Sequence, residues 1–240
     1  MGRAVSGSLE YEVRVSNRAR HARLSVSYAG RVTIVIPERF SRAKVPEIVD
    51  AKRDWIEQAQ RRFASEGALV VDRQAGERPE RLHFRMTGEE LPITYRASTG
   101  PARAVERSGL LVIISEPNDE DSQRLAMKRY LARRARKELS PRLALMAGRV
   151  GVRVKSISIR AQQTRWGSCS PSGAISLNSS LLFLPEPLVH YVLLHELCHR
   201  RELNHSPRFW TLLTQFEPNS EGLRRDLRAG WHFVPGWLND

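Results

Sequence analysis

The chain has 240 residues, of which 39 are Lys or Arg and 26 are Asp or Glu, so its formal charge is +13. With 41% hydrophobic residues it is neither collagen-like nor wholly disordered, and no run of about 18 apolar residues predicts a membrane-spanning helix. The N-terminus lacks the apolar run of a secretory signal, and two cysteines are too few for a disulfide framework. We therefore expect a globular protein of the reducing cytoplasm.

Charge and histidine are distributed unevenly along the chain. Residues 151–240 carry 10 basic and 7 acidic side chains, which leaves 29 basic and 19 acidic side chains in residues 1–150. Five of the seven histidines lie in residues 151–240. We therefore expect a basic surface in the first part of the chain and the chemistry in the second part.

Alternating apolar and polar residues predict a small antiparallel sheet near the N-terminus. The alternating segments are residues 9–16, 24–28 and 32–36. A turn at Gly30 precedes the last of them. Apolar residues at helical spacing then predict a surface helix over residues 41–63 that packs on these strands. Residues 64–81 have no clear period, so we expect a mostly irregular connection there.

A second group of short alternating segments predicts another antiparallel sheet. These segments are residues 82–86, 91–96, 102–107 and 110–115. A long helix is expected over residues 119–148, with a bend or a break at Pro141. Two more strands, residues 154–160 and 174–178, are expected on either side of a loop that contains the sequence RWGSCS at residues 165–170.

A mostly apolar segment, residues 188–203, contains the sequence HELCH. Two prolines precede it, as fits the first turn of a helix, and apolarity on all sides predicts that this helix is buried. Residues four apart project from the same face, so the imidazoles of His195 and His199 are able to bind one ion. Zinc accepts such nitrogens at about 2.0–2.1 Å, and Glu196 is placed to act as the general base toward zinc-bound water. The motif predicts an open catalytic metal site.

The third metal ligand is expected ten residues after the first. His205 gives the spacing HExxHxxxxxH, which is that of the metzincin signature HExxHxxGxxH with Glu202 in the place of the glycine. The chain must then turn later, and Asn204 is expected to adopt the left-handed conformation that ends helices. Glu217 and Glu221 are alternative third ligands, and His205 is favoured because imidazole is the commonest metal ligand.

The order of these motifs resembles the YgjP-like metallopeptidase family, which is related to the SprT-type and other zincin hydrolases. The resemblance includes the opening strands and the helix with the sequence DWI, but its most specific segments are residues 165–170, 175–178, 195–199 and 204–210. It implies a zincin-like fold in which His195, His199 and His205 bind one zinc ion per chain. It also implies that Glu196 is the catalytic base.

The predicted fold class is α+β, and the predicted elements divide into two parts. Residues 1–118 are expected to form a β-rich N-terminal part with antiparallel strands and one surface helix. Residues 119–240 are expected to form the zincin-like metallohydrolase domain around the buried HExxH helix.

Four further residues are expected in the site. The guanidinium of Arg165 suits a catalytic role, fixing a substrate anion or steadying an oxyanion, with a structural salt bridge to the helix as the alternative. Residues 174–178 are expected to be the sheet edge beside the cleft, where an extended peptide pairs through its main chain. Ser176 and Asn178 on that strand, together with Trp166, are therefore expected to bind substrate. Core packing is the alternative for Trp166.

The expected function is hydrolysis of a peptide bond by a zinc metallopeptidase, with a peptide or protein as its substrate and no membrane partner. One alternative is a UTP-type nucleotide pyrophosphatase that uses the same metal site, with Arg165 and the basic helix of residues 124–137 receiving phosphates. Another is a DNA-associated SprT-like protease. Residues 124–137 contain seven Lys or Arg and no acid, which on a helix would attract nucleic acid, although such runs are often solvated surface.

Overall fold

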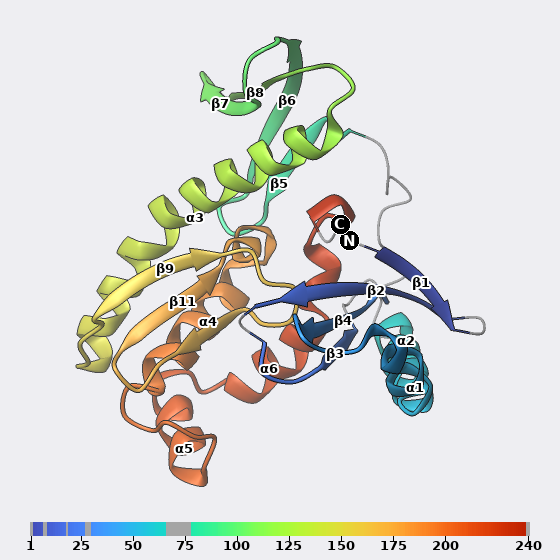
Figure 1. Cartoon of the computed structure of the whole chain (residues 1–240). Coiled ribbons are helices and arrows are strands. Elements are labelled where there is room, and N and C mark those ends of the chain that lie inside the picture. Colours follow the sequence, from blue (N-terminus) through green and yellow to red (C-terminus); the bar gives the residue numbers. More distant parts are fainter. Residues whose placement is uncertain (1, 7–8, 18, 27–29, 66–77, 239–240) are drawn as a thin grey trace. The chain divides into compact units, whose positions relative to one another are not determined.

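The structure, a computed structural model, describes residues 2–6, 9–17, 19–26, 30–65 and 78–238 (Figure 1). The chain forms two compact units, residues 1–73 and residues 74–238. The predicted boundary between residues 118 and 119 falls inside the second unit. The predicted α+β class is confirmed, because each unit combines a β-sheet with helices.

The first unit contains a mixed four-stranded sheet. Its strands are β1 (Gly2–Ser6), β2 (Leu9–Ser16), β3 (Arg23–Val26) and β4 (Val32–Pro37), in the order β1-β2-β4-β3. Strand β4 pairs parallel to β2 and antiparallel to β3. The prediction of an antiparallel sheet is therefore wrong. Alternation fixes which residues face the core, but it does not fix which strand lies beside which.

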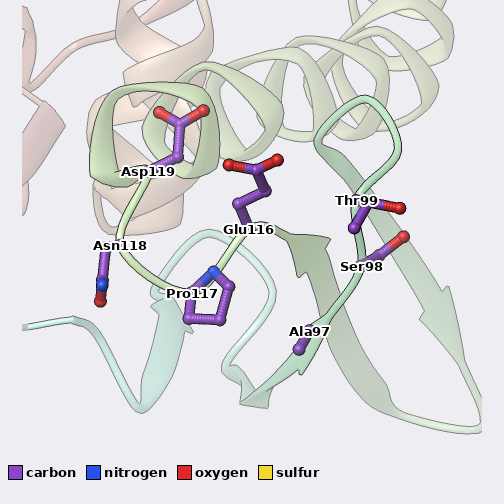
Figure 2. Close-up of a pocket in the computed structure, with 7 residues that line it drawn as sticks. All are labelled: Ala97, Ser98, Thr99, Glu116, Pro117, Asn118 and Asp119. Atoms are coloured by element: carbon purple, nitrogen blue, oxygen red, sulfur yellow. The ribbon is translucent and has the colours of Figure 1, made fainter.

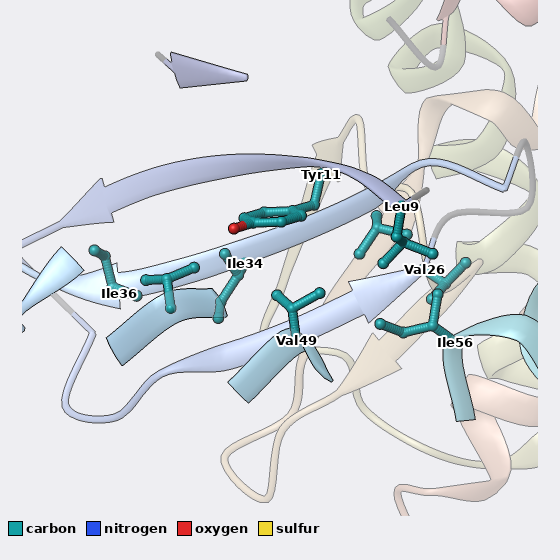
Figure 3. Close-up of a cluster of buried hydrophobic side chains, with 9 residues drawn as sticks. Leu9, Tyr11, Val26, Ile34, Ile36, Val49 and Ile56 are labelled. Carbon is teal, nitrogen blue, oxygen red and sulfur yellow. The ribbon is translucent and has the colours of Figure 1, made fainter. Parts of the chain in front are cut away.

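Two helices pack on this sheet. The helix predicted over residues 41–63 is divided into α1 (Val45–Asp50) and α2 (Arg53–Ser65), after a short 3₁₀ turn, η1 (Arg42–Lys44). Val49 of α1 and Ile56 of α2 are fully buried in one cluster with Ile34 of β4 and Tyr11 of β2 (Figure 3). Burial of each such aliphatic side chain stabilises the fold by about 1.5–3 kcal/mol. The predicted packing of this helical segment on the strands is confirmed.

The second unit begins with a sheet of the same topology. Its strands are β5 (Arg81–Phe84), β6 (Glu89–Ala97), β7 (Arg103–Arg107) and β8 (Leu110–Ser115), in the order β5-β6-β8-β7. Here β8 lies parallel to β6 and antiparallel to β7. The predicted strands are present, but the predicted antiparallel pairing is again wrong for the central pair.

Helix α3 (Glu120–Val150) is the longest element of the second unit (Figure 1). The side chain of Asp119 caps its first turn by accepting a hydrogen bond from the main-chain N–H of Ser122, and the helix continues through Pro141 without dividing. Four of its side chains at a spacing of four residues are fully buried: Leu131, Ala135, Leu139 and Leu143. Helix α3 contacts β7, β8, β9 and α4, so it joins the first sheet of this unit to the elements that follow.

The last part of the second unit is a three-stranded sheet followed by three helices. The strands are β9 (Ser156–Arg160), β10 (Gly167–Cys169) and β11 (Ala174–Asn178), and the helices are α4 (Glu186–Cys198), α5 (Pro207–Phe216) and α6 (Ser220–Arg228). Short 3₁₀ turns are η3 (Ser179–Phe183), η4 (Gly230–Phe233) and η5 (Gly236–Leu238). The order β10-β11-β9 places β11 in the centre, so the prediction that residues 174–178 form the edge is wrong. Among the described helices, none combines the length and apolarity needed to cross a membrane.

Candidate metal centre

Helix α4 carries the HExxH motif through the core. Leucine and valine residues on all its sides are buried, and a proline in its first turn starts the helix, as the sequence predicts. His195 lies in the last turn, and His199 is the C-cap residue with right-handed helical angles. The rings of His195 and His199 are therefore neighbours on one face, with centroids 4.9 Å apart.

His205 completes a cluster of three imidazoles. It lies in the turn between α4 and α5, and its Nε2 atom is 2.9 Å from Nε2 of His195. One ligand atom from each of His195, His199 and His205 lies within 4.8 Å of the others, which places all three within reach of a single ion. The alternative ligands Glu217 and Glu221 lie outside this cluster, so the structure favours His205 as the third ligand.

The turn that returns His205 to the cluster is made without a glycine. Asn204 does not adopt the left-handed conformation, because Ser108 is the sole non-glycine residue with a positive φ among the described residues, so that expectation is wrong. Instead, Oδ1 of Asn204 accepts a hydrogen bond from the main-chain N–H of Ser206. The carbonyl of Glu202 lies 3.0 Å from Nδ1 of His199, which leaves Nε2 of that ring for a metal.

Helix α5 holds the cluster from the other side. The ring of Phe209 lies within 4.9 Å of all three imidazole centroids. Trp210 stacks on His205 at an interplanar angle of 21°, and its indole N–H donates a hydrogen bond to the His205 carbonyl. Burial lowers the pKa of His195 to about 3, with a smaller contribution from the two other histidines. The imidazole is thus neutral at neutral pH, which is the state that binds a metal.

Glu196 is a buried carboxylate beside this cluster. Its side chain is 5% exposed, and its Oε2 atom has no hydrogen-bond partner among the described residues. Burial raises the pKa of Glu196 to about 7, although the nearby charge of Arg165 partly offsets this effect. An unpaired buried carboxyl oxygen is unfavourable unless a further group, such as a water or an ion, satisfies it.

Gly167 gives Glu196 its space. A Cβ atom at position 167 would lie 2.6 Å from Oε1 and 2.8 Å from Cγ of Glu196, closer than non-bonded atoms approach. The main chain of β10 therefore runs directly against the carboxylate. The glycine of the RWGSCS segment is required by this approach and not by its backbone angles.

The structure places the other predicted site residues differently. Arg165 is exposed and close enough to Glu196 to affect its pKa, and no salt bridge of Arg165 is found within residues 78–238. Trp166 is buried, stacks on Trp231 at 4.0 Å, and lines the pocket beside Glu196. Ser176 lies on the central strand and not at the sheet edge, and its hydroxyl has no partner among the described residues.

Asn178 has a structural role in this fold. It is fully buried, and its amide nitrogen donates hydrogen bonds to the carbonyls of Gln162 and Arg165 while its Oδ1 accepts one from the N–H of Ser180. Both N–H donors of its amide and one acceptor position of its Oδ1 are thus committed to the main chain, and the side chain has no exposed surface. The substrate-binding prediction for Asn178 does not fit this environment. The residue holds the loop that carries Arg165 and Trp166.

A pocket of about 370 Å³ opens over the cluster of three histidines. Among the side chains that line it are Trp166, Tyr191, His195, Glu196, Trp210 and Arg224. Arg224 was not among the residues predicted from the sequence, because nothing in the local pattern separates it from Arg225 and Arg228 on the same helix. Its place in the site follows from the packing of α6 against α4.

A larger cavity of about 710 Å³ lies where β6 and β8 end and α3 begins (Figure 2). It is lined by loop residues with two carboxyl groups, those of Glu116 and Asp119, and by no histidine or cysteine. Asp119 is already engaged in capping α3. The chemistry of the lining residues, and not the volume, identifies the smaller pocket as the candidate active site.

Comparison with known proteins bears on this geometry. The sequence profile of the YgjP-like metallopeptidase domain matches residues 20–230, which is most of the chain. The chain belongs to the YgjP-like metallopeptidase family. It is therefore a metallopeptidase-type hydrolase, as the resemblance of the motifs predicts. The YgjP-like domain includes all three histidines of the cluster.

One solved structure is also similar to this YgjP-like chain. It is the crystal structure of the zymogen of abylysin, a metallopeptidase from Pyrococcus abyssi. The identity is 24%, the match covers 36% of this chain and 90% of the other, and the TM-score is 0.34. No curated protein matches the chain in sequence.

Proposed function

We propose that the chain is a zinc-dependent peptidase in which Glu196 takes the proton from the water that attacks the peptide carbonyl. The observation that carries this proposal is the Glu196 carboxyl group, which is buried with one oxygen unpaired and adjoins the first of three converging imidazoles. A carboxyl group with a pKa of about 7 is suited to accept a proton and to return it to the leaving amine near neutral pH.

The donor set supports zinc as the metal. Neutral imidazole nitrogens are preferred ligands of zinc, and three of them leave a position open, as in catalytic zinc sites. When bound, zinc supplies Lewis-acid chemistry, because it acidifies water and polarises a carbonyl oxygen. His195, His199 and His205 would hold one ion per chain, and the Glu202 carbonyl would orient the ring of His199.

The sheet edge that supports peptide binding is β10. It lies at the edge of the three-stranded sheet within the described part of the chain, and its Gly167 is in contact with Glu196. An extended peptide that pairs with β10 through main-chain hydrogen bonds would bring its carbonyl toward Glu196 and the imidazoles. This proposal transfers the role expected of residues 174–178 to residues 167–169 and keeps Trp166 as one wall of the pocket.

The test compares the wild-type protein with Glu196→Gln. Metal content is measured by elemental analysis, and hydrolysis is measured with a broad library of quenched peptides. We expect one zinc per chain in both proteins and a loss of about 10²–10⁴-fold in kcat for the variant, because the amide cannot take a proton. Glu221→Gln on the surface of α6 is the matched control and should be as active as wild type. Equal activity of Glu196→Gln and wild type would overturn the proposed role of Glu196.

The nucleotide alternative is tested in the same experiment. The cations Arg165 and Arg224 lie near the site, so an anionic substrate group is compatible with the pocket. Pyrophosphate release from nucleoside triphosphates, lost in Glu196→Gln and without any peptide cleavage, would replace the peptidase proposal. The cytoplasmic location expected from the sequence stays a prediction.

The basic segment 124–137 gives less support to a DNA-associated role. Several of its cations are engaged within the protein: Arg134 pairs with glutamates, Arg133 donates to the Ala104 carbonyl, and Arg136 donates to the Ile157 carbonyl. These arginines hold α3 against neighbouring strands. We therefore propose no nucleic-acid partner for this chain.

A further inference from the structure

Arg224 places a positive charge in the pocket over the three histidines. It lies on α6, is exposed, and lines the same pocket as His195, Glu196 and His205. Its guanidinium carbon is 4.3 Å from the centroid of the Trp210 ring, a distance at which a cation is attracted by the aromatic face. The position of the charge is therefore set by packing on the indole.

The guanidinium of Arg224 has no acidic partner within the described residues. Arg134 and Arg142 of the same unit do lie next to glutamates. The charge of Arg224 acts on His195, His205 and Tyr191, and none of these three side chains is an anion at neutral pH. Five N–H donors in a planar fork thus face a pocket whose one carboxylate, that of Glu196, lies against Gly167.

Trp210 fixes the distance between this charge and the metal ligands. The same indole that contacts Arg224 stacks on His205 with ring centroids 5.4 Å apart, and its N–H is bonded to the His205 carbonyl. The guanidinium therefore packs on Trp210 and not on a metal ligand. A substrate group that binds this guanidinium would lie beside the reacting carbonyl and would not be the carbonyl itself.

We propose that Arg224 selects peptides that carry a carboxylate close to the scissile bond, binding this carboxylate in the pocket beside Trp210. The inference rests on the proposed peptidase function and specifies its substrate class. Arg pairs with carboxylate through two parallel hydrogen bonds, and no acidic side chain among the described residues forms a salt bridge with Arg224, so these donors are available. The carboxylate is supplied either by an acidic side chain or by the C-terminus of a short peptide.

The experiment measures binding separately from catalysis. Zinc-loaded Glu196→Gln is titrated with acetylated hexapeptides that carry Glu or Gln at one position, each with a free or an amidated C-terminus. Binding is followed by calorimetry and by tryptophan fluorescence, since Trp166 and Trp210 both line the pocket. We expect at least one Glu or free C-terminal peptide to bind about tenfold or more tightly than its amide counterpart. A preference for Glu over Gln indicates that an acidic side chain is bound, and a preference for the free over the amidated C-terminus indicates that the C-terminal carboxylate is bound.

Variants of Arg224 test whether this residue causes the preference for carboxylate peptides. Arg224→Gln in the same background should reduce the preference for carboxylate over amide to about twofold or less, and Arg224→Lys should retain part of it because the charge remains. Arg225→Gln, the next residue on α6, is the matched control and should keep the full preference. In the active protein, the same comparison is made as the ratio of kcat/KM for acidic and amide substrates.

Three outcomes would overturn the proposal. One is equal binding of carboxylate and amide peptides by the Glu196→Gln protein. Another is a preference that survives Arg224→Gln. The third is a loss of kcat in Arg224→Gln that is equal for acidic and amide substrates, which would assign Arg224 to the oxyanion instead. Absence of hydrolysis in wild type, with carboxylate binding intact and dependent on Arg224, would contradict the proposed function but not the anion site.

Tighter binding of a nucleoside triphosphate than of any carboxylate peptide, lost in Arg224→Gln, would also overturn the assignment to a carboxylate. Each protein must contain one zinc per chain and show an unchanged circular dichroism spectrum before the comparison is made. This requirement separates a change in the pocket from a change in the fold.

Discussion

At the scale of single residues, the contact between Gly167 and Glu196 shows how closely the carboxylate that we propose as the catalytic base is surrounded. The main chain of β10 occupies the space on one side of Glu196, and the helix α4 supplies the other. No water layer separates the two elements at this point, since a single added carbon would overlap the carboxylate. The orientation of Glu196 is thus set by backbone, which is more rigid than a side-chain partner.

Gly167→Ala is predicted to displace Glu196 without removing the metal ligands. The new methyl group would lie 2.6 Å from the carboxylate oxygen, so the Glu196 side chain must rotate or shift. Displacement of a catalytic group by about 1 Å lowers activity by about 10²-fold, so we expect a loss of kcat of that order. Metal content and KM should change little, and both are measured together with peptide hydrolysis.

The matched control is Gly148→Ala on α3, where no atom lies within 4 Å of the added carbon. This change should leave activity unaltered and stabilise the protein by about 0.5–1 kcal/mol, because alanine favours a helix over glycine. Full activity of Gly167→Ala would show that the carboxylate position is not critical.

The metal site was predictable from the sequence at this scale, because helix geometry alone places His195 and His199 on one face. His205 was predicted from the spacing HExxHxxxxxH. The turn before it is made with a hydrogen bond from Ser206 to Asn204 and not with the expected left-handed Asn204. Arg224 and the packing role of Gly167 were not predictable, since each meets its partner from a distant part of the sequence. Asn178 shows the limit of such reasoning in the other direction, because this polar residue on a strand near the site is hydrogen-bonded to the main chain, and its contact with a substrate stays a prediction.

At the scale of elements, strands were predicted better than their pairing. In each of the three sheets, the second strand of a hairpin lies between the first strand of that hairpin and an earlier strand, to which it is parallel. The parallel pairs are β4 with β2, β8 with β6, and β11 with β9. Each hairpin turn carries a glycine with positive φ, at Gly30, Gly109 and Gly173, and the turn at Gly30 was predicted from the sequence. The parallel neighbour is chosen by the packing of whole strands, which leaves no local mark.

Helix α3 is fixed to the first sheet of its unit by one nearly buried cation. The side chain of Arg134 is 11% exposed and pairs with Glu89 of β6, Glu106 of β7 and Glu138 of the helix itself. The hydroxyl of Tyr130 donates a hydrogen bond to the same Glu106. These charged partners lie on three elements, so the contact determines how α3 sits on the sheet.

Arg134→Met is predicted to lower the free energy of unfolding by about 2–3 kcal/mol. The loss is below that of a fully buried pair, since the three glutamates are 22–35% exposed and water partly screens their charges. Urea denaturation followed by circular dichroism measures it. Arg129→Met, an exposed position on the same helix, should change stability by less than about 0.5 kcal/mol. An equal effect of the two substitutions would mean that the glutamate cluster contributes nothing specific.

At the scale of the whole molecule, the candidate site lies within one of the two compact units. The first unit has its own core, formed between its sheet and α1 and α2 (Figure 3). The second contains the cluster of three histidines, Glu196 and the pocket. The division predicted after residue 118 would separate α3 from β7 and β8, with which it is in contact. The predicted start of the metallohydrolase domain at residue 119 does not coincide with the division between the compact units at residues 73 and 74, and it stays a prediction.

Residues 74–240 alone are predicted to fold and to bind one zinc ion per chain. This segment contains the three imidazoles, the proposed base Glu196, and the buried faces of α3 and α4 with the sheets they cover. We therefore expect its core to form without the first unit. The 167 residues of this segment are also enough to close a hydrophobic core without added cross-links. The measurement is elemental analysis together with thermal unfolding, with and without a chelator.

Zinc that binds the folded state alone raises the unfolding temperature, so its removal by the chelator should lower the midpoint of the segment and of the full chain alike. The same segment with His199→Ala should lose both the metal and this response. A segment that unfolds cooperatively yet holds no metal, when the full chain holds one ion, would show that the first unit contributes to the metal site. Such a result would be consistent with a family domain that begins at residue 20, within the first unit.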